Sequence, residues 1–577
     1  MSVADREANF EILERPVPQL RGALADLSPL LRRVYAARGV AADTDIELTT
    51  KALLQPTGLR NSEPAAARIA DAIQGDEKIV IVGDFDADGA TASALAVSLL
   101  AALGARQVEF LVPNRFEFGY GLTPEMVAVA LRHAPNLLIT VDNGISSVAG
   151  VRCANEAGID VVVTDHHLPG DELPDAFAIV NPNQAGCSFP SKHLAGVGVI
   201  WYLLSVVRRQ LRERDWFANR AEPNPADWLD LVALGTVADV VVLDQNNRIL
   251  VAQGLKRMRA GRARPGIRAL AQVAGRALPQ LQAQDLGFAL GPRLNAAGRL
   301  EDMSIGIRCL LATTDDEGVK LATALNELNR ARRSIEQEMT QEAELAVLDL
   351  GDELAASWGL TVHRPHWHQG IVGIVAGRVR ERFNRPVIAF AEAGATAEDE
   401  LKGSARSIPG LHIRDVLAAI DAKFPGLIVR FGGHAMAAGL SLKRRHYERF
   451  ARAFDAAVGQ RLDPADLEQR VMSDGELAAT DLDLTNALSL ASAGPWGQGF
   501  PEPLFHGDFE LVSQRIVGES HLKMVLGADG HVFDAIKFRQ PPLPGTSQVR
   551  IAYHLSVNEY RERRSLQLLV EHLMALN

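Results

Sequence analysis

The sequence predicts an α/β protein built from several separately packed units, and three features lead to this prediction. From Lys78 onward, short apolar runs alternate with helical patterns, which is typical of parallel strands joined by helices. After Asp302 comes a charged stretch with helical spacing and no proline, and from about Arg461 short alternating segments lie between Gly/Pro turns. A single core stops growing at roughly 250–300 residues, so the 577 residues indicate about three to four units.

The charge balance excludes a uniformly basic surface but leaves nucleic acid open as a partner. Lys and Arg number 60 against 71 Asp and Glu, which gives a formal net charge of −11. This argues against a basic coat for duplex DNA, although a total charge hides local patches and counts metal-binding carboxylates as surface charge. Local basic patches and acidic metal sites therefore both stay open.

The sequence favours a cytoplasmic protein. The cysteines Cys153, Cys187 and Cys309 lie far apart, so we expect neither a disulfide framework nor a zinc-binding CxxC pair. The N-terminus has acidic residues where an export signal would have a basic start and an apolar core. The uncharged run at residues 89–105 falls short of the roughly 20 apolar residues that span a membrane, so we expect a buried helix there and no membrane partner.

The first α/β unit is expected at residues 71–310, after an N-terminal helical segment at residues 1–70. Its strands read as continuous apolar runs, such as KIVIVGD, VEFLVP, NLLITVD and VVVTDHH, with helical patterns between them. Such runs are typical of parallel strands that helices cover on both faces. Ligands of parallel sheets bind beyond the carboxyl ends of the strands, and the acidic motifs of this chain fall at such ends.

Three further elements are expected after this unit. Residues 311–352 predict one long connecting helix, because apolar residues recur at helical spacing without proline. A second α/β unit follows at residues 353–460, with the strand-like RPVIAF and the Gly-rich FGGHAMAAGL. Residues 461–577 contain short alternating segments such as HLKMVLG and QVRIAYHLSV, which predict a small β-barrel or sandwich.

The motif GDFDADGAT places Asp84, Asp86 and Asp88 at alternating positions where a buried strand ends. One Asp at such a point is typical of a helix cap, so a capped strand-to-helix turn is the alternative interpretation. Three carboxylates within a few residues repel one another strongly unless protonation or a cation compensates them. The motif therefore favours a cation site.

Further acidic motifs follow other predicted strands. VDNGI places Asp142 after the next apolar strand, VTDHH places Asp165, His166 and His167 after another, and Asp239 follows a helical stretch. Strand ends of one parallel sheet lie side by side, so these side chains can converge on one site. Carboxylates with a single imidazole favour Mn²⁺ or Mg²⁺ over zinc. A pair of ions that share a carboxylate is an arrangement that hydrolyses phosphoesters.

These motifs also carry a family resemblance. DFDADG at residues 84–89, VDNG at 141–144, DHH at 165–167 and GTVADVV at 235–241 resemble the DHH phosphoesterase superfamily, and the whole chain is similar to its RecJ family. The resemblance implies a parallel-sheet DHH phosphoesterase domain, a long connecting helix, an α/β DHH-associated domain and a C-terminal OB-like β-barrel. It also implies a metal-dependent exonuclease that degrades single-stranded DNA from 5′ to 3′ to mononucleotides.

The setting of this activity is likewise implied by resemblance. Members of the family are expected to act in DNA recombination and repair. The expected partners are single-stranded DNA, single-strand-binding protein and a RecQ-type helicase, and the expected state is a monomer. Composition alone indicates none of these.

By resemblance, two ions, Mn²⁺ or Mg²⁺, are expected in the acidic site. Asp86 and Asp142 would hold the first ion, with Asp84 close by. The residues that would hold the second ion are Asp88, Asp142, His166 and Asp239, so Asp142 would bridge the two. His167 would face the scissile phosphate; a histidine satisfied by its neighbours at a strand end is the alternative interpretation. Asp165 is either a further ligand or the acceptor of an imidazole N–H.

The resemblance assigns the other candidate residues to DNA. Ser404, Arg406 and His434 are expected at the DNA backbone or the terminal 5′ phosphate. FGGHAMAAGL is interpreted as a Gly-rich turn that opens a helix, whose N–H groups attract phosphate; tight packing is the alternative reason for its glycines. The residues expected along the DNA path of the first unit are Arg115, Tyr120, Arg293, Asn295 and Arg299. Ion pairs are the alternative for these arginines, and core packing is the alternative for Tyr120.

Two other functions fit parts of this pattern. The first is a DHH phosphoesterase that acts on short oligonucleotides, and the C-terminal β unit argues against it because such enzymes tend to be shorter. The second is a non-catalytic nucleic-acid-binding scaffold that keeps the fold and has lost the chemistry. The complete set of acidic and histidine residues argues against the scaffold.

Overall fold

The computed structural model describes residues 10–19, 24–114, 119–351, 353–394, 399–518, 520–560 and 563–576. The chain forms two compact units. The first unit consists of Gln19–Arg330 and Ser492–Glu502, and the second unit consists of Met1–Pro18, Ala331–Ala491 and Pro503–Asn577. The finer domain boundaries expected from the sequence, after residues 70, 310, 352 and 460, stay predictions.

The first unit contains a parallel sheet with the strand order β3-β2-β4-β5-β6. Its strands are β2 (Ile79–Val82), β3 (Val108–Leu111), β4 (Leu137–Val141), β5 (Asp160–Thr164) and β6 (Ala178–Val180). Every residue of β2 and β4 is buried, which explains the unbroken apolar runs in the sequence. Because β2, β4 and β5 are neighbours, the carboxyl ends that precede the acidic motifs lie side by side.

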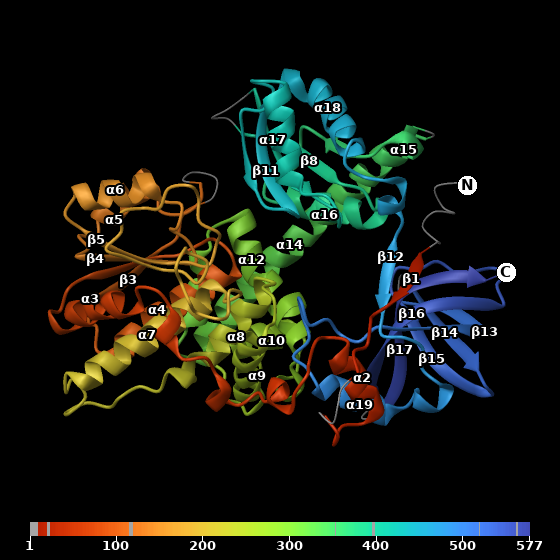
Figure 1. The fold of residues 1–577 in the computed structure, drawn as a ribbon, viewed down its shortest axis with the longest axis horizontal. Helices are drawn as coiled ribbons and strands as arrows, with labels where there is room; N and C mark the ends of the chain where they lie inside the picture. Colours follow the sequence, from red (N-terminus) through yellow and green to blue (C-terminus); the bar gives the residue numbers. More distant parts are fainter. Residues whose placement is uncertain are drawn as a thin grey trace. The chain divides into compact units, whose positions relative to one another are not determined.

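Helices cover both faces of this sheet (Figure 1). One face carries α5 (Pro124–Leu131) and α6 (Val148–Glu156), and the other carries α3 (Ser62–Gln74), α4 (Ala87–Leu103) and α7 (Gly196–Glu213). Val127 and Val151 of the first pair pack against Val80 and Val163 of the strands. Helix α4 is rich in Ala and Leu and is buried along most of its length, because it also packs against α7 and α8 (Leu229–Ala238). The uncharged run at residues 89–105 is therefore a buried helix, as predicted.

The rest of the first unit is helical. Its elements are α2 (Pro29–Ala36), α8 (Leu229–Ala238), α9 (Gln245–Arg259), α10 (Pro265–Val273), the π-helical turn η6 (Leu286–Leu290), α12 (Gly291–Leu300) and α13 (Ser304–Leu311). The returning segment Ser492–Glu502 packs onto them. Trp496 stacks on Phe500 with ring centroids 5.2 Å apart, and the Arg248 guanidinium lies 4.2 Å from the Phe500 ring centroid.

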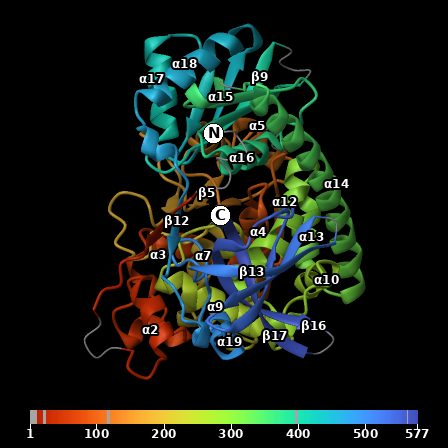
Figure 2. The same ribbon diagram turned by 90° about the vertical axis from the view of Figure 1, so that its right-hand side faces the viewer.

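Asp315–Leu348 forms one helix of 34 residues, α14, which confirms the predicted connecting helix (Figure 2). Its first turn contains Asp315, Asp316 and Glu317, and acidic residues stabilise the positive end of a helix. None of the described helices combines the length and the apolar composition that crossing a membrane requires.

The second unit contains a mixed sheet with the strand order β10-β11-β9-β8-β7. Its strands are β7 (Leu360–His363), β8 (Val387–Glu392), β9 (Glu400–Arg406), β10 (Arg430–Gly433) and β11 (Ala437–Lys443). On one face, α17 (Ile413–Lys423) and α18 (Tyr447–Gly459) lie side by side and bury Phe390, Leu401 and Leu440. Helix α16 (Val372–Phe383) packs on β8 and β9.

The Gly-rich motif FGGHAMAAGL forms a β-hairpin, so the predicted turn before a helix is wrong. Its two halves are β10 and β11, which pair antiparallel with Gly432 opposite Gly439. A Cβ atom at either glycine would meet nothing within 4 Å, whereas Gly433 has φ +146° and lies close to Ala438. The small residues therefore serve a flat hairpin, and His434 stands at its turn instead of at a helix start.

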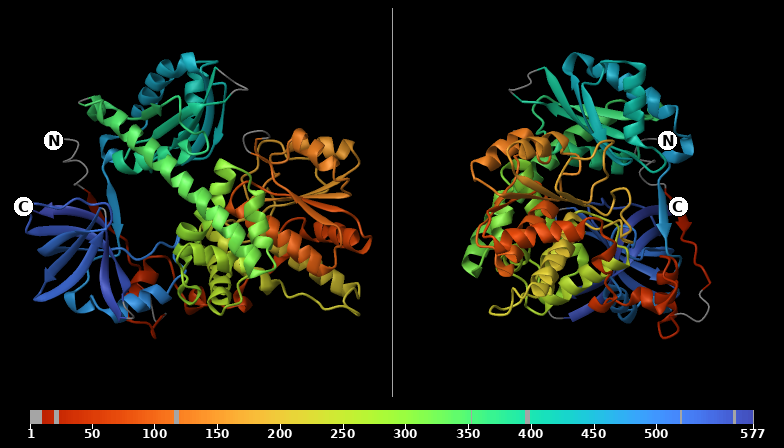
Figure 3. Two further views of the ribbon diagram at one scale, coloured as in Figure 1. Left: turned by 180° about the vertical axis from the view of Figure 1, so that it is seen from behind. Right: turned by 60° about the vertical axis from the view of Figure 1, so that its left-hand side comes forward.

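The C-terminal region is a closed barrel with the strand order β13-β14-β15-β17-β16, which confirms the OB-like barrel (Figure 3). Its strands are β13 (Phe505–Val517), β14 (His521–Ala528), β15 (His531–Lys537), β16 (Gln548–Tyr560) and β17 (Arg563–Leu576). Alternate residues face the interior: Leu522, Met524 and Leu526 of β14 are buried. This is the period-two pattern that the sequence showed.

The N-terminal segment is only partly helical. Helices α2 and α3 form as expected, but Glu11–Glu14 makes strand β1, which pairs in parallel with β12 (Arg470–Ser473) of the second unit. The Arg470 Nε donates to Glu11 Oε2 at 3.2 Å. This partner lies 459 positions away along the chain, so no local pattern indicates the strand.

Candidate active site

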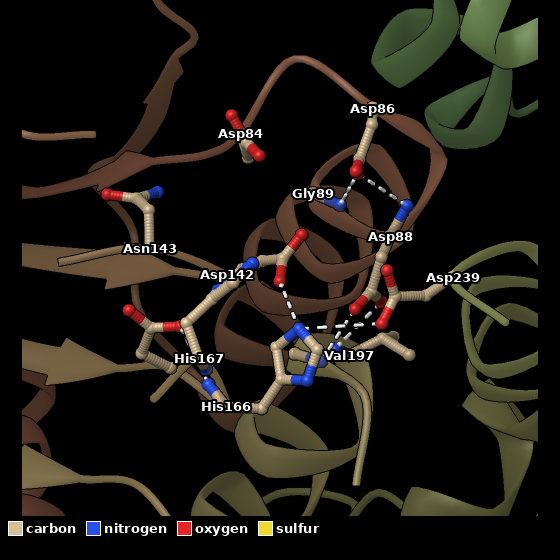
Figure 4. Close-up of polar contacts among 12 residues, drawn as sticks. Asp84, Asp86, Asp88, Gly89, Asp142, Asn143, His166, His167, Val197 and Asp239 are labelled. Carbon is tan, nitrogen blue, oxygen red and sulfur yellow. Dashed lines mark hydrogen bonds and ion pairs between the residues drawn. The ribbon is translucent and has the colours of Figure 1, made fainter. Parts of the chain in front are cut away.

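The acidic motifs converge at the carboxyl edge of the parallel sheet (Figure 4). Asp84, Asp86 and Asp88 follow β2, Asp142 follows β4, and His166 follows β5. Asp239 comes from a different element, since it caps the C-terminus of α8. The residues that the sequence selected for a cation site are thus neighbours in space.

Backbone N–H groups fix the carboxylates of the first motif. Asp86 is the N-cap of α4 and accepts from the N–H groups of Asp88 and Gly89, both at 3.0 Å. The carboxylate of Asp88 in turn accepts from the N–H groups of Gly196 at 2.6 Å and Val197 at 3.0 Å. These two residues begin α7, and a helix N-terminus stabilises negative charge. Sequence reasoning did not select Gly196 or Val197, because backbone donors carry no side-chain signal.

Close packing fixes Asp142. Its backbone has φ +62°, and its N–H donates to the Thr164 carbonyl at 3.0 Å. A Cβ atom at Gly196 would lie 2.5 Å from the Asp142 Cβ, so α7 approaches this closely only because residue 196 is glycine. The AGVG sequence at the start of α7 was the available signal.

His166 links the carboxylates. Its Nε2 lies 3.1 Å from Asp142 Oδ1 and 3.4 Å from Asp239 Oδ2 (Figure 4). The groups whose ligand atoms lie within 4.8 Å of one another are Asp84–Asp86–Asp142, Asp88–His166–Asp239 and Asp142–His166–His167. Asp142 belongs to more than one group, as a bridging ligand must.

The electrostatics of this centre fit a divalent cation. Burial, and secondarily the charge of Asp86, raises the pKa of Asp88 to about 7. Burial and the charge of Asp88 also raise the pKa values of Asp142 and Asp239 well above the usual range. Burial, with the neighbouring His167, lowers the pKa of His166 to about 4, so its imidazole is neutral. Asp142 Oδ1 and His166 Nε2 are buried 3.1 Å apart without the geometry of a hydrogen bond, and within the described residues neither atom has another hydrogen-bond partner. A cation would satisfy both atoms and compensate the repulsion.

Asp165 orients His167 rather than joining the carboxylate group. Asp165 is fully buried and accepts from the Ile145 N–H at 2.9 Å and from the His166 N–H at 2.7 Å. His167 Nδ1 lies 2.8 Å from Asp165 Oδ1. Burial opposes the charge on His167, but the hydrogen bond and the charge of Asp165 raise its pKa to about 9. The Tyr120 hydroxyl lies 3.1 Å from His167 Nδ1, and Tyr120 is 45% exposed, which argues against core packing.

Comparison with known proteins assigns the family. Family models match the chain as the DHH family, N-terminal domain (residues 78–236), the DHHA1 domain (354–460) and the RecJ OB domain (473–572). The single-stranded-DNA-specific exonuclease RecJ of Dickeya dadantii is 54% identical over 97% of this chain and 98% of its own length. That of Escherichia coli is 50% identical over 98% and 99%.

The chain belongs to the RecJ family. A solved structure of RecJ in complex with Mn²⁺ from Thermus thermophilus matches it with a TM-score of 0.81 at 30% identity, over 99% of this chain and 80% of that chain. A further structure of the Thermus thermophilus RecJ is a complex with Mg²⁺, with a TM-score of 0.76 at 27% identity over 100% and 79%. RecJ-family structures thus hold the two metals that the sequence favoured.

The residues that the RecJ resemblance places along the DNA path do not share one environment in the structure. Asn295 Oδ1 accepts from the Ala87 N–H at 2.8 Å, so Asn295 supports the acidic loop. Arg293 is buried and donates to Asn326 Oδ1 at 3.0 Å and to the Ala289 carbonyl at 2.6 Å. These contacts favour a structural role for Arg293, and its contact with DNA stays a prediction. Arg299 is half-buried in the last turn of α12, and Arg115 lies outside the described residues.

In the second unit, the side chains of Ser404 and Arg406, which the RecJ resemblance assigned to DNA, lie beside the start of α16. Both are on β9, and Arg406 Nη1 donates to Ser404 Oγ at 3.0 Å. A Cβ atom at Gly373, in the first turn of α16, would lie 2.8 Å from Arg406 Nη2 and 2.9 Å from Ser404 Oγ. Burial, with the charge of Arg380, lowers the pKa of Arg406. Sequence reasoning missed Gly373, for which the GIVG repeat before α16 was the signal.

Proposed function

We propose that this chain is a metal-dependent exonuclease that degrades single-stranded DNA from the 5′ end to mononucleotides and acts in DNA recombination and repair. The convergence of five carboxylates and one imidazole at a single sheet edge carries this proposal. The names of its RecJ relatives, which are single-stranded-DNA-specific exonucleases, support the substrate. The complete acidic set argues against a scaffold without chemistry.

The proposed metal ligands come from the three groups of neighbouring side chains. Asp86 and Asp142 would hold one ion, with Asp84 beside them, and the second ion would be held by Asp88, Asp142, His166 and Asp239. Bound Mn²⁺ or Mg²⁺ would stabilise charge on the attacking and leaving oxygens of the phosphodiester. The helix N-termini of α4 and α7 hold Asp86 and Asp88 in place before any ion binds.

His167 is the proposed protein group at the scissile phosphate. Asp165 engages its Nδ1, and the Tyr120 hydroxyl lies 3.4 Å from its Nε2. Nε2 would exchange this long contact for a phosphate or leaving oxygen. Tyr120 is exposed next to it and offers a face for stacking on an unpaired base. Asp165 acts through His167 by fixing the direction of the ring.

The second unit supplies the proposed site for the 5′ phosphate. Arg406, Ser404 and the first N–H groups of α16 offer donors of one sign next to each other, and Arg suits phosphate through its bidentate fork. His434 stands at the turn of the neighbouring hairpin. Arg299 is the proposed backbone contact of the first unit. The proposed 5′ polarity itself rests on the resemblance to the RecJ family.

We also propose a cytoplasmic monomer that meets single-strand-binding protein and a RecQ-type helicase. The free cysteines Cys153, Cys187 and Cys309 fit a reducing compartment. Light scattering of the purified chain tests the monomer, and co-sedimentation with each purified partner tests the contacts.

A digestion time course with Mn²⁺ tests the function. Long single strands labelled at the 5′ or the 3′ end are digested next to a duplex and a dinucleotide. Immediate release of labelled mononucleotide from the 5′-labelled single strand alone is the expected result. Fast cleavage of the dinucleotide with slow cleavage of the long strand would instead indicate a phosphoesterase of short oligonucleotides, and no metal-dependent product would indicate a scaffold.

A further inference from the structure

Phe288 is the most exposed large hydrophobic residue within the described part of the chain, at 79%. It stands in η6, a π-helical turn between α11 (Ala283–Asp285) and α12. Such turns are rare and frequently occur at functional sites. A solvent-exposed aromatic ring at such a turn is a candidate for binding a ligand.

The exposure of Phe288 does not come from a loose segment. Leu286, Ala289 and Leu290 of the same turn are buried. The buried Arg293 donates to the Ala289 carbonyl at 2.6 Å and thereby stabilises the turn on its buried side. The backbone around Phe288 is thus fixed while its ring points outward. Little backbone conformational entropy is therefore lost when a ligand binds the ring.

The turn packs against the end of α8, directly before the proposed metal ligand Asp239. A Cβ atom at Gly287 would lie 3.2 Å from Val237 Cγ1, and one at Gly291 would lie 3.1 Å from the Ala238 Cβ. Both glycines therefore allow a close approach to the last turn of α8. The residue after Asp239 is Val240, which has φ +61° and is 64% exposed. An exposed apolar side chain, that of Val240, thus stands directly after the proposed ligand Asp239.

We propose that Phe288 stacks on an unpaired base of the strand whose phosphate lies at the acidic centre. This inference rests on the proposed function and adds a residue that selects for single strands. Every base has a π-face, so stacking tolerates any sequence, whereas the faces of bases in a duplex are already covered. Val240 would form the apolar border of the same surface.

Abasic substrates test the stacking. Single strands that carry one abasic site at successive positions from the 5′ end are digested by the wild type, Phe288→Ala and Phe288→Tyr, and KM and kcat are measured. We expect the wild type to show a rise in KM of about ten-fold at one abasic position, the order that loss of one stacked base produces. Phe288→Ala should show the same rise with intact strands and no further rise with abasic ones. Phe288→Tyr should behave like the wild type.

Phe177→Ala is the matched control. Phe177 is a second exposed aromatic residue of the first unit, at 51%, and it precedes β6 at the amino edge of the sheet, away from the acidic residues. Its removal should leave KM unchanged. An abasic penalty that persists in Phe288→Ala, or an unchanged KM in that variant, would overturn the stacking role and point to a protein partner for Phe288. A wild type without metal-dependent digestion would instead overturn the proposed function.

Discussion

The two sites with charged side chains use helix N-termini in opposite ways. At the edge of the first sheet, the N–H groups that begin α7 donate to the protein's own carboxylate, that of Asp88. At the second sheet, the start of α16 meets the guanidinium of Arg406 and the hydroxyl of Ser404. In the first site the helix stabilises an acid that attracts a cation. In the second site the helix start and the side chain have the same sign, which suits an anion such as the proposed 5′ phosphate.

Burial separates the two sites as well. Asp84, Asp88 and Asp142 are each at most 3% exposed, whereas Ser404, Arg406 and His434 are partly exposed. Desolvated like charges cost free energy until a counter-charge arrives, while a half-buried arginine keeps contact with water. The first site should therefore depend on its ions for activity and stability, and the second should modulate the choice of DNA end.

Asp142→Ala is the change with the largest expected effect. Asp142 is the group shared by the proposed ions, so its loss should lower kcat/KM on single strands at least about a thousand-fold, while strand binding stays measurable. Initial rates with Mn²⁺ and fluorescence anisotropy with a labelled strand measure the two effects. Asp160→Ala is the control, because Asp160 lies at the amino end of β5 and pairs with Arg68. Activity of Asp142→Ala within ten-fold of that control would rule out the bridging role.

Gly196→Ala should come next, with a loss of about a hundred-fold. The added methyl group would meet the Asp142 Cβ at 2.5 Å and displace the bridging carboxylate without removing any ligand. Gly198→Ala, in the same helical turn, meets only the Leu194 side chain at 3.3 Å and should be close to neutral. Circular dichroism checks that both variants fold. Equal activity of the two variants would show that the close approach of α7 does not position Asp142.

These residues also show what the sequence can and cannot reveal. Predominantly apolar runs predicted β2 and β4, and the acidic residues directly after them predicted the site. The donors from Gly196 and Val197 were not foreseeable, because they are main-chain groups 108 and 109 positions away from Asp88. Side-chain identity reveals ligands, whereas the groups that hold the ligands are revealed by the fold.

The same limit explains the two errors in the fold. Glycine and alanine in FGGHAMAAGL suit a tight helix start and a flat hairpin equally well, and pairing with β9 decided for the hairpin. Strand β1 depends on a partner at the far end of the chain. Arg293 is buried and donates to the Ala289 carbonyl, so its predicted contact with DNA stays a prediction.

Arg406→Ala should have a moderate effect that is confined to the DNA end. Loss of the guanidinium should reduce the preference for 5′-phosphorylated over bare ends about ten-fold, with little change in kcat once digestion has begun. Competition between the two substrates measures the preference. Arg445→Ala removes a cation of the second unit whose side chain is 71% exposed, and it should keep the preference. If the wild type uses both ends equally, the phosphate assignment fails.

The smallest effect concerns stability without metal, and its sign distinguishes the two kinds of acid. Asp239 is half-buried, and burial together with the charges of Asp88 and Asp86 raises its pKa well above the usual range. Asp239→Asn should therefore stabilise the chelator-treated protein. A gain of about 1 kcal/mol would raise the midpoint of thermal unfolding by roughly 1–2 °C in a unit of this size. Asp160→Asn breaks the ion pair with Arg68 and should not raise the midpoint of thermal unfolding. With Mn²⁺ the wild type should have a higher unfolding midpoint than Asp239→Asn, because the wild type gains metal-binding free energy that the variant loses. A lower midpoint for Asp239→Asn in chelator would mean that its carboxylate is already compensated, and that the repulsion which distinguishes the acidic centre from the Arg406 site is absent.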